Sequence, residues 1–272
     1  MTAGQRLDGR RAVITAGAGG IGLEIAKAFV GLGAKVHVAD IDPKALSFAR
    51  AELAGLGATL ADVSRPQDVD RVFDEAIATM GGVDVLVNNA GIAGPTLPAE
   101  QIAIEDWDRV IATNLSAMFY CARRAIPLLA RSGGGSIVNM SSAAIRHGGF
   151  PMRLPYAVSK VAVHGLTETL AMELGRHGIR VNTVMPGAVE GERLSKVLAA
   201  EAAAAGVSLA AMREEAAASS SMRTMIGATD VAEVVAFLCS ERARYISGQA
   251  LAVCGNFEGH RSASSSTVGE KE

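Results

Sequence analysis

The sequence is poor in cysteine, and its three cysteines are scattered along the chain at Cys121, Cys239 and Cys254. No two of them stand in C-x-x-C spacing, and an odd number cannot pair completely. The pattern therefore indicates neither a disulfide framework nor a zinc site. We expect buried free thiols and no bound metal.

The sequence also lacks an excess of charge of either sign. It has 26 Lys and Arg against 28 Asp and Glu, with a formal net charge of -2, and no block of like charges. Such a chain has no basic field to attract nucleic acid. No apolar run approaches the ~20 residues that span a bilayer, and residues 1–11 lack the apolar centre of a secretory signal. We therefore expect a cytoplasmic protein with neither nucleic-acid nor membrane partners.

Aromatic residues are scarce at 4%, although hydrophobic residues make up 49% of the chain. The excess is Ala, Val, Leu and Ile, together with 30 glycines, a mixture typical of small helix faces packed on buried parallel strands. A length of 272 residues fits one large α/β domain. We assign residues 1–258 to this domain and expect the serine-rich residues 259–272 to be a disordered tail.

Short runs rich in Val and Ile alternate with longer segments of helical period, which is the rhythm of βαβ units. The pattern predicts strands at 11–15, 35–39, 58–61, 83–87, 136–140, 179–184 and 251–253. It predicts helices at 20–32, 43–54, 66–80, 104–131, 156–176 and 230–240. The expected fold class is α/β, with a doubly wound, seven-stranded parallel sheet in a single domain.

One alanine-rich stretch, residues 190–221, interrupts this rhythm but favours helix. It is either a pair of ordinary surface helices or a mobile lid over the substrate. Because long insertions in compact domains tend to be functional, we favour the lid.

A glycine-rich turn, Thr15-Ala-Gly-Ala-Gly-Gly-Ile-Gly22, lies between the first predicted strand and the first predicted helix. This context places backbone N–H groups and a helix N-terminus where a pyrophosphate can bind. Asp40 ends the next strand, where a carboxylate can accept hydrogen bonds from both adenosine ribose hydroxyls and repel a 2′-phosphate. The alternative is that Asp40 only opens the turn to Asp42. No basic residue stands at Ala18, Gly19 or Ile41, so the pattern favours NAD over NADP.

Tyr156 and Lys160 are four residues apart on a predicted helix, so both side chains lie on one face. A neighbouring ammonium favours the phenolate form of tyrosine, which makes Tyr156 a usable general acid and base. Ser142, leaving a strand end fourteen residues upstream, can donate a hydrogen bond to a substrate carbonyl oxygen.

Together with Asn88-Asn-Ala-Gly91, Asn114 and Pro186-Gly187, these motifs resemble the classical short-chain dehydrogenase/reductase family over residues 7–255. The resemblance implies a Rossmann fold and an NAD-dependent oxidoreductase that interconverts a secondary alcohol and a ketone. It implies a catalytic set of Asn114, Ser142, Tyr156 and Lys160. The cofactor-binding set that it implies is Gly17, Gly19, Gly20, Ile21, Gly22, Asp40, Asp62, Val63, Asn89, Ala90, Gly91, Tyr156, Lys160, Pro186, Gly187 and Val189.

Three positions depart from the family pattern. Ala16 stands where the first glycine of the turn is usual, and Gly191 stands where a threonine often contacts the nicotinamide. The interval from Ser142 to Tyr156 is one residue longer than is common, so Ser141 is the alternative hydrogen-bond donor to the substrate.

Four basic residues are candidates for substrate contact: Arg146, His147, Arg153 and Arg193. They suggest a polar or anionic hydroxy compound, unless they face solvent or a neighbouring subunit. Phe150, Met152 and Leu154, from the same loop, would equally line a pocket for a cyclic alcohol.

The alternative function is a catalytically silent NAD(H)-binding sensor or scaffold, but the intact catalytic set argues for an enzyme. Residues 104–131 and 156–176 each carry more apolar positions than one sheet face can cover. The family resemblance implies that these two helices pair across a twofold axis, so we expect a homotetramer, or at least a dimer.

Overall fold

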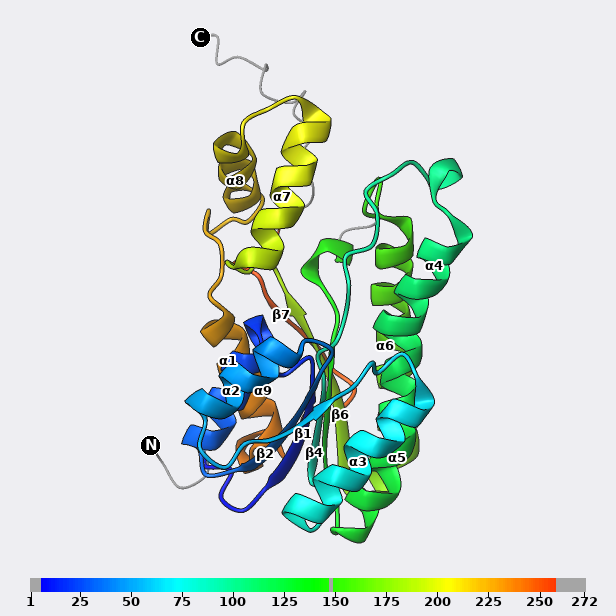
Figure 1. The fold of residues 1–272 in the computed structure, drawn as a ribbon, viewed down its shortest axis with the longest axis vertical. Helices are drawn as coiled ribbons and strands as arrows, with labels where there is room; N and C mark the ends of the chain where they lie inside the picture. Colours follow the sequence, from blue (N-terminus) through cyan, green and yellow to red (C-terminus); the bar gives the residue numbers. More distant parts are fainter. Residues whose placement is uncertain (1–5, 147–148, 258–272) are drawn as a thin grey trace.

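The computed structural model describes residues 6–146 and 149–257, and seven parallel strands form its central sheet. The strand order is β3-β2-β1-β4-β5-β6-β7 (Figure 1). The strands are β1 (Arg11–Thr15), β2 (Lys35–Asp40), β3 (Gly57–Leu60), β4 (Val85–Asn88), β5 (Gly135–Met140), β6 (Ile179–Pro186) and β7 (Ala250–Val253). The predicted doubly wound, seven-stranded parallel sheet is confirmed, with strand ends shifted by at most two residues.

Helices cover both faces of the sheet (Figure 1). One face carries α1 (Gly20–Gly31), α2 (Pro43–Glu52) and α9 (Ala228–Cys239). The other carries α3 (Pro66–Met80), α4 (Ile104–Ile111), α5 (Ala117–Arg131) and α6 (Leu154–Leu174). Two clusters of buried side chains fill the space between the sheet and these helix layers. The central strands are apolar on both faces because each face lies under helices.

The segment predicted as one helix over residues 104–131 is divided in the structure. Between α4 and α5 lies a π-helical turn, Ala112–Ser116, that contains Asn114. A π-turn widens the helix by one residue per turn, and such turns occur frequently at functional sites. The helix expected at 156–176 also begins earlier, at Leu154, with Pro155 in its first turn.

Residues 190–221 form two helices, α7 (Glu192–Ala205) and α8 (Leu209–Ala218), between β6 and α9. They project beyond the sheet at the edge where β6 ends, and are yellow in Figure 1. Arg213 of α8 donates a hydrogen bond to Ser195 of α7 at 3.2 Å. Leu198 and Ala202 of α7 are buried, whereas α8 has no buried residue. Of the two helices, α7 is therefore the one that packs against the rest of the protein.

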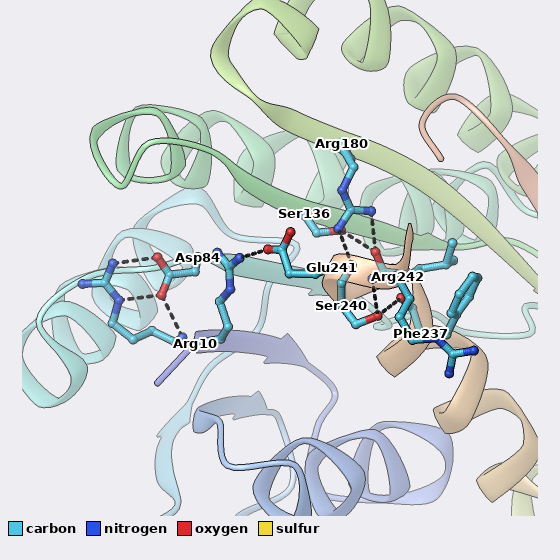
Figure 2. A network of polar contacts seen from close by, with 10 residues as sticks. Arg10, Asp84, Ser136, Arg180, Phe237, Ser240, Glu241 and Arg242 are labelled. Atoms are coloured by element: carbon cyan, nitrogen blue, oxygen red, sulfur yellow. Dashed lines mark hydrogen bonds and ion pairs between the residues drawn. The ribbon is translucent and has the colours of Figure 1, made fainter. Parts of the chain in front are cut away.

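Ion pairs and arginine–carbonyl hydrogen bonds stabilise the sheet at the amino ends of its strands (Figure 2). Arg11 at the start of β1 binds both oxygens of Asp84 at 2.7 Å, just before β4. Burial raises the pKa of Asp84, but the hydrogen bonds from Arg11 outweigh that effect and lower the pKa below its usual value. Arg180 of β6 donates to the carbonyl oxygen of Leu238 at the end of α9. These contacts lie away from the strand ends that carry the predicted site, so they stabilise the fold there.

The three cysteines are free and buried, as predicted. Burial raises the pKa of Cys121 to about 12. Within residues 6–146 and 149–257, no helix is both long enough and apolar enough to cross a membrane. The tail predicted for residues 259–272 lies outside the described residues.

Candidate active site

The predicted site residues gather where the strand order reverses. β1 and β4 are neighbours in the sheet but are separated in sequence by β2 and β3, so the chain leaves their carboxyl ends in opposite directions. In open parallel sheets, ligands bind in the crevice at such a switch point. The glycine turn follows β1, and Asn88-Asn-Ala-Gly91 follows β4.

The glycine turn has the close contacts and the open space that a bound pyrophosphate requires. A Cβ on Gly22 would lie 2.0 Å from the carbonyl oxygen of Ala16, and a Cβ on Gly17 would lie 2.6 Å from the Val38 side chain. A Cβ on Gly19 or Gly20 would meet nothing within 4 Å. The first turn of α1 carries no acidic residue. The N-terminus of α1 is therefore open and electrostatically suited to an anion.

Ala16, which replaces the usual first glycine, adopts the conformation that glycine would favour. Its φ is 47°, in the left-handed region that is strained for an alanine. The turn therefore keeps its path and carries local backbone strain instead.

Thr15 and Asn89 join the glycine turn to the end of β4, and the sequence predicted only one of them as a site residue. The hydroxyl oxygen of Thr15 accepts hydrogen bonds from the backbone N–H groups of Asn89, at 3.0 Å, and Ala90, at 2.9 Å. The Asn89 amide donates to the carbonyl oxygens of Thr15 and Ala16. Asn89 was predicted as a cofactor contact, whereas Thr15 was not predicted as a site residue. The signal in the sequence for the role of Thr15 was its position, because it is a hydroxyl residue at the end of a predicted strand.

The two predicted acids of the nucleotide site are both held by backbone groups. Asp40 accepts hydrogen bonds from the N–H groups of Ala18 and Asp42, each at 3.1 Å. Its carboxylate therefore lies against the glycine turn and also opens the turn to Asp42. Its contact with a ribose stays a prediction. Asp62 accepts from the backbone N–H and hydroxyl of Ser64. The neighbouring Val63 is buried.

Asn114 and Lys160 both lie close to Gly91. A Cβ on Gly91 would lie 3.2 Å from Asn114 Oδ1 and 3.4 Å from Lys160 Nζ. A side chain at this position would therefore crowd Asn114. Lys160 Nζ lies 5.9 Å from the centre of the Tyr156 ring and donates to the carbonyl oxygen of Met140 at 2.8 Å. The predicted spacing of Tyr156 and Lys160 thus places them on one side of α6.

Asn114 is fully buried in the π-turn and is held from three directions. Its Oδ1 accepts from the N–H of Ile92 at 2.7 Å, and its Nδ2 donates to the Ile92 carbonyl oxygen and to Ser159 Oγ. Ser159 donates in turn to the Tyr156 carbonyl oxygen. Asn114 therefore links the segment after β4 to the helix that carries the tyrosine.

The structure separates the roles of the two candidate serines. The Ser141 hydroxyl donates to the carbonyl oxygen of Lys160 at 2.8 Å, so its proton is already used. Ser142 Oγ instead accepts a hydrogen bond from the N–H of Ala144 at 3.2 Å, which leaves its own proton available. Ser142 is therefore the better donor to a substrate oxygen.

The predicted nicotinamide segment, Pro186 to Val189, is fixed by backbone pairing. The N–H of Gly187 donates to the carbonyl oxygen of Val253 at 2.8 Å, and a Cβ on Gly187 would lie 2.9 Å from Cys254. Val189 forms an isolated parallel bridge with Ile226. Gly191 stands where the family often has a threonine. Its φ is 150° immediately before α7, a backbone conformation that favours glycine.

The four basic residues predicted to contact substrate lie in different surroundings. Arg146 is exposed and lines a surface hollow of about 640 Å³ with Val161, His164 and β7, which Tyr156 does not line. Arg153 is buried, with 4% of its surface exposed, and lies 3.3 Å from Glu201 of α7. His147 and the side chain of Arg193 lie outside the described residues.

Comparisons with known proteins identify the family. A family model described as Enoyl-(Acyl carrier protein) reductase matches residues 16–257. The chain is 34% identical over 254 residues to 7alpha-hydroxysteroid dehydrogenase of Escherichia coli, with 92% of this chain and 94% of that protein covered. It is 35% identical over 252 residues to sorbitol dehydrogenase of Cereibacter sphaeroides, with 92% and 98% covered.

A solved structure of 7 alpha-hydroxysteroid dehydrogenase, complexed with NADH and 7-oxo glycochenodeoxycholic acid, matches with a TM-score of 0.84. The sequence identity is 32%, and the match covers 95% of this chain and 97% of the other. Family and fold agree over almost the whole length. The chain belongs to the short-chain dehydrogenase/reductase family.

Proposed function

We propose that this protein is an NAD(H)-dependent oxidoreductase that interconverts a secondary alcohol and a ketone. The observation that carries the proposal is the grouping of Lys160 with Asn114 at Gly91 and with the Tyr156 ring, whose centre lies 5.9 Å from Lys160 Nζ. The relative of known structure that binds NADH supports the choice of cofactor.

The chain's residues fit a dinucleotide at this edge of the sheet. The N-terminus of α1 would hold the pyrophosphate, Asp40 the adenosine ribose, and Lys160 the nicotinamide ribose. The chemistry that bound NAD⁺ supplies is acceptance of a hydride, so a secondary alcohol and NAD⁺ give a ketone, NADH and a proton.

The protein supplies orientation and proton transfer for this reaction. Ser142 donates a hydrogen bond to the substrate oxygen, where charge develops. Tyr156 takes the hydroxyl proton during oxidation and returns it during ketone reduction. Lys160 Nζ lies 5.9 Å from the centre of the Tyr156 ring, on the same side of α6. Asn114 keeps the π-turn next to Tyr156 and can hold a water that relays the proton towards solvent.

The substitution Tyr156→Phe tests the proposal. It removes the transferable proton and keeps the ring, so turnover of secondary alcohols, followed by NADH absorbance, should fall by roughly 10²- to 10⁴-fold. The affinity for NADH, measured by fluorescence, should change less than twofold. Tyr245→Phe is the matched control, because Tyr245 is 90% exposed and lies outside the site. Retention of more than a tenth of the turnover by Tyr156→Phe would contradict the proposed acid and base.

The substrate is not fixed by the family, since the names of the relatives include a steroid and a polyol. Selection among alcohols therefore depends on this chain's own loop before α6 and on α7 and α8. We propose that α7 and α8 act as a lid, because the inner face of α7 reaches Arg153 beside Tyr156.

A further inference from the structure

Arg153 occupies an unusual position, since a buried cation lies next to the tyrosine. Its guanidinium carbon lies 5.2 Å from the centre of the Tyr156 ring and 5.2 Å from that of Phe150. Its Nη2 donates to the carbonyl oxygen of Ala93, in the segment after β4, at 3.1 Å. The cation is therefore held by groups around the site and lies within electrostatic reach of any substrate bound at Tyr156.

The counter-charge for this cation comes from the lid. Glu201 Oε1 lies 3.3 Å from Arg153 Nη1, and the Glu201 side chain is 25% exposed. Glu201 shares the inner face of α7 with Leu198 and Ala202, which are both buried. Burial raises the pKa of Glu201, Arg153 opposes that rise and Glu215 adds to it. Glu201 therefore lies at the interface between α7 and the loop before α6, where burial disfavours its charge and Arg153 favours it.

We propose that Glu201 is a specificity-determining residue, which neutralises Arg153 and so makes the site select neutral substrates over anionic ones. The proposal rests on the proposed function, because the substrate must bind at Tyr156. An anionic substrate gains little from a cation that already has a carboxylate at 3.3 Å, and it meets that carboxylate as a like charge. A neutral alcohol experiences neither effect.

The pair also explains why Arg153 does not act as the open anion site that the sequence suggests. A substrate carboxylate that took the place of Glu201 at Nη1 would remove the ion pair between α7 and the loop before α6. Removal of the Glu201 charge alone would leave Arg153 in place without the carboxylate that lies 3.3 Å from its Nη1. The site should then favour anions, because a ligand carboxylate can supply the charge that Glu201 no longer supplies.

The decisive variant is Glu201→Gln, which keeps an amide oxygen close to Arg153 and removes the charge. The probes are levulinate, a keto acid, and methyl levulinate, its neutral ester, each reduced with NADH. The ratio of kcat/KM for acid over ester should rise at least tenfold in the variant. Most of that rise should come from a lower KM for the acid. A loss of lid structure alone would change kcat/KM equally for both probes and leave their ratio unchanged.

Two further variants separate the Arg153–Glu201 pair from general charge effects. Glu192→Gln makes the same change on the same helix but removes only the exposed ion pair with Lys196, so its ratio should equal that of the wild type. The double variant of Glu201→Gln with Arg153→Met has no cation to recruit the acid, so its ratio should fall back towards the wild-type value.

A binding measurement decides the case even if neither probe is reduced. Levulinate affinity for the enzyme–NADH complex, measured by calorimetry, should strengthen at least tenfold in Glu201→Gln, with no comparable change for methyl levulinate. An unchanged acid-to-ester ratio in both turnover and binding overturns the role of Glu201. Failure of the proposed function would look different: the wild type would bind no NADH, or Tyr156→Phe would keep its turnover.

Discussion

At the scale of single residues, Asp40 has a structural role, and we propose that it also recognises the cofactor. Its two hydrogen bonds from Ala18 and Asp42 hold the carboxylate against the glycine turn, which is where the adenosine ribose of a bound dinucleotide would lie. A 2′-phosphate at that position would meet a negative charge.

The substitution Asp40→Ala should therefore narrow the preference for NAD(H) over NADP(H). We expect the ratio of the two dissociation constants, measured by nicotinamide fluorescence, to fall at least tenfold, and by less at high salt because ions screen the repulsion. Both affinities can weaken as the turn loses its hydrogen bonds, so the ratio is the relevant quantity. Asp42→Ala removes the same charge from the N-terminal cap of α2 and should leave the ratio unchanged. Equal preference in wild type and Asp40→Ala would contradict this role.

Residues that act through local spacing were predictable, and those that act through distant partners were not. Tyr156 and Lys160 are one helical turn apart, so their grouping follows from the period of the helix. Arg153 and Glu201 are separated by 48 residues. Nothing in the local pattern of either residue indicates the other, so the sequence did not predict their ion pair. Contact between Arg153 and substrate stays a prediction.

At the scale of elements, hydrophobic period predicted every strand and the main helices but not the π-turn. The apolar positions of residues 104–131 keep a helical spacing, and one extra residue in a single turn hardly changes it. The hydrogen bonds of Asn114 to Ile92 and Ser159 hold the turn, and these partners come from two other segments. The interruption is therefore set by tertiary contacts.

A buried histidine joins β2, β3 and α3. His37 is 1% exposed, and its Nε2 lies 2.8 Å from the hydroxyl oxygen of Thr59, which itself donates to the Glu75 carboxylate. Because that hydroxyl proton is used, His37 Nε2 carries the hydrogen of this contact. Burial lowers the pKa of His37 from 6.5 to about 4, Glu75 opposes this shift and Arg50 adds to it.

Stability should therefore depend on pH through this contact. Between pH 6.5 and about 4 the unfolded chain binds a proton at His37 and the folded chain does not. The free energy of unfolding should fall as pH falls through that window, by up to about 3 kcal/mol. Denaturant titrations of wild type and His37→Gln at several pH values measure the effect, since the variant should lose this component of the slope. His177→Gln, at an exposed position, should keep it. Identical slopes for wild type and His37→Gln would contradict the expected shift.

At the scale of the whole molecule, exposed apolar side chains gather on the face of the sheet that α5 and α6 cover. On the face formed by α5 and α6, apolar side chains remain exposed: Phe119 by 51%, Val161 by 54% and Met172 by 86%. Met172 also borders a surface hollow of about 500 Å³, together with Ile126 and Ala130 of α5. Exposed apolar surface of this kind, gathered on two long helices, is typical of an interface between subunits.

We therefore predict a homotetramer, or at least a dimer, in which α5 and α6 meet their counterparts across a twofold axis. In a twofold interface each exposed side chain meets the same surface of the partner, so one charge introduced per chain enters the contact twice. Phe119→Glu and Met172→Glu should each lower the mass measured by light scattering at micromolar concentration. Phe48→Glu is the matched control, because Phe48 is 61% exposed on α2, which covers the opposite face of the sheet. Its mass should equal that of the wild type. A monomeric wild type would overturn the prediction, and dissociation by Phe48→Glu alone would place the interface on the α2 face instead.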